Sequence, residues 1–192
     1  MKTTTTTTTA RDAEPKPRTG ASAAPNDLDD LAALGADELA RLYAAGSVPA
    51  DLSDLVGRPK GRMLAVRATD GTPLFGALKL LAAQALFPWD GKTFGAGTPS
   101  EGTGINRVKL GPLRYDWFPF KARVEPSVVD GQPCIYLDYE QPGNPFFIAK
   151  IRDEIRELRP GLFLGPAMWK TGPHDAAHVL WFAVDFAEPS QA

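Results

Sequence analysis

Two segments of the chain alternate apolar and polar residues with a period of two, and this pattern constrains the fold most. The first covers residues 117–125, where apolar side chains stand at Phe118, Phe120, Ala122 and Val124. The second covers 179–186 and is apolar on one side and largely so on the other. Such alternation is typical of strands that face a core. Shorter runs at 61–68, 92–95, 104–110, 134–140 and 162–170 bring the predicted total to about seven strands.

The connections between these runs favour antiparallel pairing. Asp130 and Gly131 join two alternating runs, which is a strong hairpin signal. The other connections are rich in Gly and Pro and contain no regular succession of helices, so a doubly wound sheet and a TIM barrel are both excluded. The sequence therefore predicts a mainly β (α+β) fold: an antiparallel, closed or nearly closed β-barrel with about three flanking helices.

Three segments show helical spacing instead. In the first, Asn26 precedes an acidic turn, apolar residues follow at Leu28 and Leu31 and, after a break at Gly35, at Leu39, and Gly46 can end the segment. The second begins at Thr72 and Pro73 and stops at Pro88. The third begins at Asn144, and its apolar residues, spaced three, four and three apart, are Ile148, Ile151, Ile155 and Leu158. We predict a helix in each.

Composition narrows the class of protein. Hydrophobic residues make up 43% and charged residues 23% of the 192 residues, as in globular proteins. The net charge of −2 gives no basic field for a nucleic acid partner. The single cysteine, Cys134, cannot form an internal disulfide, which favours a reducing, cytoplasmic location. No apolar run is long enough to span a membrane.

The N-terminal 25 residues differ from the rest of the chain. They begin with threonine at every position from 3 to 9 and contain no large apolar residue after Met1. Such a composition predicts a disordered tail, and it lacks the apolar centre of a secretory signal. We therefore expect one barrel domain over residues 26–192.

A polar residue on an inward strand face is the best signal of a pocket, because burying it without a partner is unfavourable. Asn106 shares a strand face with Val108 and Leu110. Tyr139 shares one with Ile135 and Leu137, so either this phenol or that of Tyr136 points inward. A hydrogen-bonded structural amide or phenol is the interpretation we favour for each of these residues.

Residues 150–159 carry the densest charge in the chain. On the predicted helix, Arg152 and Arg156 lie one turn apart with no acid between them at helical spacing. Their guanidinium groups could hold a carboxylate or phosphate of a ligand. A carboxylate of the protein itself is the interpretation we favour.

Other chemistry has weaker support. Three residues that can ligate a metal lie close together in the sequence: His174, Asp175 and His178. Because they fall in a Gly/Pro turn, we predict no metal site and no cofactor. No nucleophile motif is present, and Cys134 is interpreted as a small core residue. The glycines between 95 and 104 indicate a mobile loop at a barrel mouth, with Trp89 and Lys92 close to it.

Several short runs together resemble a protein family. They are the run 151–156, the Pro-Gly-containing run 160–165, the Pro-Trp-Asp-Gly-Lys run 88–92, and Asn106. The chain resembles a group of uncharacterised bacterial lipocalin-like (calycin-type) β-barrel proteins over residues 39–186. The resemblance implies a barrel that binds a hydrophobic small molecule, and it supplies no catalytic residues. The Gly-x-Trp signature of lipocalins is absent, because Gly57 is followed by Arg58 and Pro59.

We consider three functions. The first is binding of a hydrophobic or amphipathic molecule, such as a fatty acid, terpenoid or polyketide, inside the barrel. The candidate ligand-binding residues are Trp89, Lys92, Asn106, Phe118, Phe120, Tyr139, Arg152, Trp169 and Trp181. The second is a cyclase or isomerase that uses the same cavity, with Asp116, Asp138 or Tyr139 as the acid-base group. The third is a protein-interaction module. An inward Asp beside a void would favour the enzyme, a void with only Asn or Tyr the binding protein, and a solid barrel the interaction module.

Overall fold

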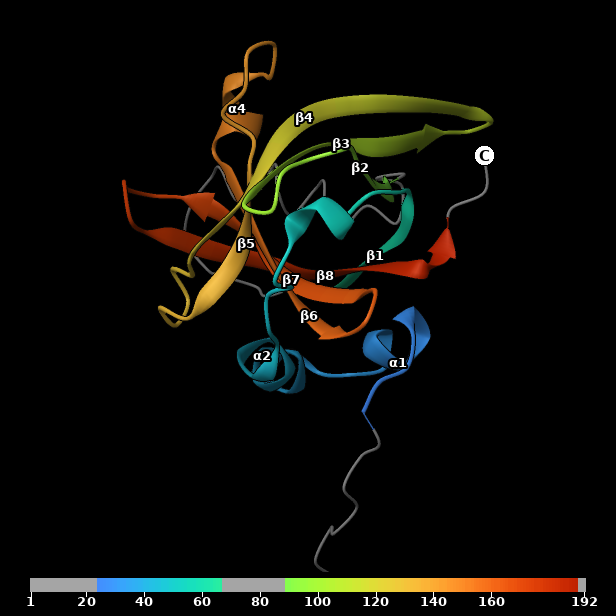
Figure 1. Cartoon of the computed structure of the whole chain (residues 1–192), viewed down its shortest axis with the longest axis vertical. Coiled ribbons are helices and arrows are strands. Elements are labelled where there is room, and N and C mark those ends of the chain that lie inside the picture. The colour runs from blue at the N-terminus through green and yellow to red at the C-terminus, as the bar shows by residue number, and fades with distance from the viewer. Residues whose placement is uncertain (1–23, 67–88, 190–192) are drawn as a thin grey trace, which may run out of the picture.

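The computed structural model describes residues 24–66 and 89–189, which form a closed antiparallel β-barrel (Figure 1). Its eight strands within these ranges follow the chain order, and β8 pairs with β1 to close the barrel. The strands are β1 (Pro59–Val66), β2 (Trp89–Phe94), β3 (Glu101–Leu110), β4 (Leu113–Pro126), β5 (Pro133–Asp138), β6 (Ile151–Arg159), β7 (Leu162–Lys170) and β8 (Ala176–Pro189). The helices are α1 (Leu28–Ala32), α2 (Ala36–Ala45), the 3-10 turn Leu52–Asp54 and α4 (Phe146–Ala149).

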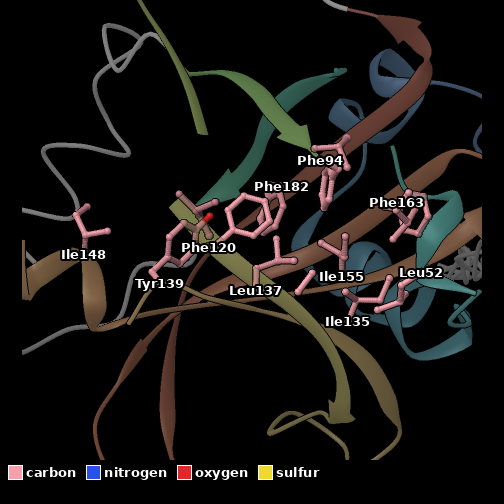
Figure 2. Close-up of a cluster of buried hydrophobic side chains, with 14 residues drawn as sticks. Leu52, Phe94, Phe120, Ile135, Leu137, Tyr139, Ile148, Ile155, Phe163 and Phe182 are labelled. Carbon is pink, nitrogen blue, oxygen red and sulfur yellow. The ribbon is translucent and has the colours of Figure 1, made fainter. Parts of the chain in front are cut away.

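Two hydrophobic clusters hold the fold together. One fills part of the barrel interior and extends from Ile148 to Leu52 and Phe163 across the view of Figure 2. The other lies outside the barrel, where Leu39 and Tyr43 of α2 pack with Trp181 of β8 and their neighbours. This second cluster explains why β8 is apolar on both faces: one face lines the interior and the other is covered by helices.

Much of the sequence-based architecture is confirmed. The chain forms the predicted antiparallel barrel, residues 128–132 connect β4 to β5, and the first helical segment divides at Gly35 into α1 and α2. Asp27, rather than Asn26, caps α1, since its side chain accepts a hydrogen bond from the Asp30 N–H. The predicted helix 72–88 and most of the predicted N-terminal tail lie outside the described residues.

The predicted helix from Asn144 to Leu158 is wrong. Only Phe146–Ala149 is helical, and residues 151–159 form strand β6 in the barrel wall. Ile151, Asp153 and Ile155 occupy one face of this strand, but the opposite face is also largely buried, beneath α2. Charged residues on both faces hid the period of two, so that the 3, 4, 3 spacing of the apolar residues looked helical. Gly161 (φ +83°), three residues after Leu158, belongs to the tight β6–β7 turn.

A bulge in β4 shapes the barrel next to the site. Pairing with β3 shifts between Ile105 and Asn106, so that Phe118 has no direct partner on β3. Phe118 adopts φ +63°, a left-handed conformation that is unfavourable for a bulky residue by about 1–2 kcal/mol. Its neighbour Trp117 is left 41% exposed. Such local strain is tolerated where surrounding structure fixes it, and here it lies at a cavity wall.

Candidate functional site

A cavity of about 320 Å³ occupies the end of the barrel interior next to α4. That volume is at the lower limit of small-molecule pockets. Its wall is mainly apolar and draws on most strands, with residues such as Met63, Val108, Ile151, Ala167 and Leu180. Phe147 and Ile148 of α4 also line it. The cavity thus lies at the Ile148 end of the buried cluster, and Leu52 and Phe163 lie at the opposite end (Figure 2).

Four polar side chains interrupt the apolar wall and bond to one another: Lys92, Asn106, Tyr139 and Asp153. Lys92 lies at the centre and is 2% exposed. Its Nζ donates to Asn106 Oδ1 at 3.0 Å, to the Tyr139 hydroxyl at 2.5 Å and to Asp153 Oδ2 at 2.8 Å. We call these four residues the polar quartet.

Aromatic rings surround the Lys92 ammonium. Its Nζ lies 5.0–5.4 Å from the ring centroids of Trp89, Phe120, Tyr139 and Phe182, within the range of cation–π attraction. Burial lowers the pKa of Lys92 below its usual value, and the Asp153 carboxylate opposes this change. Three acceptors match the three hydrogens of an ammonium, so the geometry fits the charged form of Lys92.

The backbone register brings the quartet together. Lys92 on β2 pairs directly with Asn106 on β3, whereas Asp153 on β6 pairs with Leu137, two residues before Tyr139. Tyr139 donates to Asp153 Oδ2 at 2.9 Å and accepts from Asn106 Nδ2 at 3.0 Å. Burial and the neighbouring Asp153 carboxylate raise the pKa of Tyr139 well above its usual value, so the phenol stays protonated.

Asp153 has one carboxylate oxygen without a protein partner. Oδ2 accepts from Lys92 and Tyr139, but Oδ1 is buried and has no hydrogen-bond partner among the described residues. Sequence reasoning missed Asp153 because residues 151–158 were assigned to a helix. The available signal was that Asp153 shares a period-two face with Ile151 and Ile155, which only a strand assignment would have revealed.

The structure brings five of the nine candidate ligand-binding residues to the cavity wall: Trp89, Lys92, Asn106, Phe118 and Tyr139. Phe120 does not line the cavity but belongs to the interior cluster, in edge-on contact with the Tyr139 ring. The remaining candidates do not line this cavity. Trp181 faces α2 and contacts Tyr43, Trp169 is half-buried on β7, and Arg152 lies on the outer face of β6.

Arg152 and Arg156, on β6, both pair with carboxylates of the protein. Arg152 Nε donates to Glu154 at 2.6 Å, and Arg156 binds both oxygens of Asp130 at 2.7 and 2.8 Å. The favoured interpretation, protein carboxylates as partners, is confirmed, although the arginines lie on a strand instead of on a helix.

The two aspartates considered as acid-base groups lie away from the cavity. Asp116 is exposed on β4. Asp138 lies in a polar cleft outside the barrel, where it accepts from Arg123 at 3.0 Å and from Tyr136 at 3.0 Å. Burial raises the pKa of Asp138, but hydrogen bonds from the Glu140 N–H and Arg123 outweigh this and lower it overall.

Histidine and cysteine residues are placed apart from the quartet. His174 is exposed in the β7–β8 turn, whereas the His178 ring packs edge-on against Trp181. Within 24–66 and 89–189, no group of three His, Cys, Asp or Glu residues could hold a metal ion. Cys134 is fully buried, as expected for a core residue. Among the described residues, no helix has the length and apolar character needed to cross a bilayer.

Comparison with known proteins gives little. No protein-family model matches the chain, and no curated protein matches it. Among solved structures, the chain is similar to a protein from Thermomonospora curvata, with 17% sequence identity and a TM-score of 0.49. The likeness covers 79% of this chain and 87% of that one. A likeness this remote bears on neither ligand nor activity.

Proposed function

We propose that the protein binds a hydrophobic or amphipathic small molecule inside its barrel. The observation that carries this proposal is a cavity of about 320 Å³ whose apolar wall contains the buried polar quartet. Ligand pockets typically combine such a wall with a few polar groups that fix the ligand's orientation. The candidate ligand class is a fatty acid, terpenoid or polyketide-like molecule, in keeping with the lipocalin-like resemblance.

Native mass spectrometry of the protein purified from its own host tests this proposal directly. We expect a stoichiometric small molecule that organic extraction releases. Adding the ligand back at a hundred times its Kd should stabilise the fold by about 2.7 kcal/mol, observed as a rise in Tm.

A cavity-filling variant locates the binding site. Ala167→Leu extends a side chain on the cavity wall and should abolish the retained mass and the Tm rise. Ala44→Leu is the matched control, because Ala44 is exposed on α2. If wild-type protein retains no molecule, and neither fatty acids, fatty alcohols nor polycyclic dyes raise its Tm, the proposal is wrong.

A cyclase or isomerase is the second candidate, and one observation favours it. Asp153 lines the cavity, and an inward Asp beside a cavity favours an enzyme. Its role as the counter-ion of Lys92 explains its burial without chemistry, so we place this candidate second. The hollow interior counts against a plain interaction module.

Isomerisation or cyclisation converts the ligand into a product of equal mass, which chromatography separates. Incubating the extracted ligand with a trace of protein should then give such a product, and Asp153→Asn should abolish it. Loss of product in Asp138→Asn but not in Asp153→Asn would place the chemistry outside the cavity.

A further inference from the structure

We propose that the polar quartet selects a neutral ligand group that donates a hydrogen bond, above all a hydroxyl, and rejects a carboxylate. This inference rests on the proposed binding function and names the head group of its ligand. The hydrogen bonds within the protein leave only some donors and acceptors of the quartet open to a ligand.

Lys92 has no hydrogen left for a ligand. Its three N–H groups are taken up by Asn106, Tyr139 and Asp153 at 2.5–3.0 Å. A buried lysine is the obvious site for a fatty-acid carboxylate, but this ammonium already has a carboxylate partner 2.8 Å away. Binding a second one would require breaking a buried ion pair, which is strongly unfavourable.

Tyr139 and Trp89 are also fully engaged. The Tyr139 hydroxyl donates to Asp153 and accepts from both Lys92 and Asn106. Trp89 donates its one N–H to Asn106 Oδ1 at 3.1 Å. Because Trp89 and Lys92 are donors only, they fix the oxygen of the Asn106 amide toward themselves. The Nδ2 group then keeps one hydrogen beyond the one given to Tyr139.

Asp153 Oδ1 is the main open position. It is buried and has no hydrogen-bond partner among the described residues, and the Asp153 side chain, 7% exposed, lines the cavity. An unpaired buried acceptor is unfavourable by itself, and a donor supplied by a ligand would relieve that penalty. The quartet therefore offers a ligand one charged acceptor and one amide donor.

The charge of the cavity supports the same conclusion. Lys92 and Asp153 are the only charged residues on its described lining, and their charges cancel. A ligand carboxylate would enter without a counter-ion, beside an existing anion and in an apolar surrounding, so its desolvation would not be compensated. A hydroxyl or primary amide can donate to Asp153 and accept from Asn106 without bringing in a charge.

Four ligands with the same alkyl chain test this inference: decanol, decanoate, methyl decanoate and decane. Their Kd values are measured at pH 8 by calorimetry on delipidated full-length protein. We expect decanol to bind at least tenfold more tightly than decanoate, with the ester and alkane in between. An acid that binds as tightly as the alcohol, or more tightly, overturns the head-group inference alone. Failure of all four to bind overturns the binding function as well.

Asp153→Asn provides an independent test. Lys92 and Tyr139 are both donors toward position 153, so they will keep the amide oxygen, and the new NH2 takes the place of Oδ1. Removing the anion also leaves the Lys92 charge unbalanced. We therefore expect the preference to reverse by tenfold or more, toward decanoate. Asp37→Asn, exposed on α2, is the matched control and should keep the wild-type order. An unchanged order in folded Asp153→Asn contradicts the inference, and if that variant does not fold, the wild-type series decides.

Discussion

Two consecutive residues of β6, Asp153 and Glu154, place carboxylates on opposite sides of the barrel wall, and their surroundings differ. Glu154, on the outer side, is fully buried and accepts from the Tyr43 hydroxyl at 2.9 Å, the Val128 N–H at 3.1 Å, Arg152 at 2.6 Å and Ser127. Asp153, on the inner side, leaves one oxygen without a partner among the described residues.

This difference in hydrogen bonding separates the network around Glu154 and Arg156, which we call the outer network, from the polar quartet. The outer network is structural, and the quartet is the proposed binding cluster. The bonds of Glu154 join α2 and the β4–β5 turn to the barrel, and Arg156 adds a bond to the Tyr43 carbonyl at 3.1 Å. A fully satisfied buried network stabilises one arrangement of the chain. A partly satisfied one costs stability, and such positions are retained where function uses them. The following predictions test this contrast.

The largest effect is expected for Glu154→Leu. Removing this carboxylate takes the acceptor from Arg152 Nε, the Ser127 hydroxyl and the Val128 N–H, and it leaves the Tyr43 hydroxyl with Ser127 alone. We expect the free energy of unfolding to fall by about 3–5 kcal/mol, measured by urea denaturation. A loss below about 1 kcal/mol would mean that the outer network does not hold α2 against the barrel.

The double variant Lys92→Met, Asp153→Leu should behave in the opposite way. It removes both charges together, and Asn106 and Tyr139 can still bond to each other, 3.0 Å apart. Replacing a buried ion pair by apolar residues is neutral or stabilises by about 1–4 kcal/mol. Urea denaturation should therefore show no loss of stability, while calorimetry should show that the preference for decanol is gone. A loss above about 2 kcal/mol would give the quartet a structural role.

Asp130→Asn tests the part of the outer network that Asp130 and Arg156 form, through the pH dependence of stability. Its hydrogen bonds with Arg156 hold the pKa of Asp130 below the usual 3.8. Because the folded-state pKa is lowered, the stabilisation is complete above pH 3.8 and is lost as the pH falls through the lower value. At pH 7 we expect the variant to be about 1–2 kcal/mol less stable than wild type. Urea denaturation at pH 7 and near pH 2 should show that this difference in stability shrinks at the lower pH. A difference that stays constant would contradict the pairing of Asp130 with Arg156.

The reactivity of Cys134, which lies on the outer side near Glu154, reports on the same contrast without a change in the folded state. Burial, and next the Glu154 carboxylate, raise the pKa of this thiol from 9.0 to about 12. Alkylation requires the thiolate, so iodoacetamide at pH 8 should react about a thousandfold more slowly with folded than with unfolded protein. Mass spectrometry measures the rate. Glu154→Leu should weaken this protection through easier unfolding, whereas equal weakening in Asp153→Asn would remove the contrast between the two faces.

The sequence predicted the barrel and much of its pocket for identifiable reasons. Strands such as 117–125 and 179–186 show alternation that depends only on neighbours in the chain. Asn106 and Tyr139 were found because each is polar on an otherwise apolar strand face. Asp153 was missed because β6 carries charge on both faces. Trp181 was misplaced relative to the cavity, since a period of two does not say which side of a closed wall faces inward. Arg152 was misplaced because its segment was predicted to be a helix.

The sequence by itself determined the strand class, the antiparallel hairpin at Asp130 and Gly131, and the division of α1 from α2, because these depend on local backbone preferences. The tertiary structure decided that residues 151–159 form a strand and that Asp153 and Glu154 have opposite environments. It also decided that all three ammonium hydrogens of Lys92 are used in hydrogen bonds to protein acceptors. These features depend on partners 14–111 residues away in the chain, such as Tyr139 for Asp153 and Tyr43 for Glu154. Only closure of the barrel and docking of α2 bring those partners into hydrogen-bonding range, so no local pattern could show them.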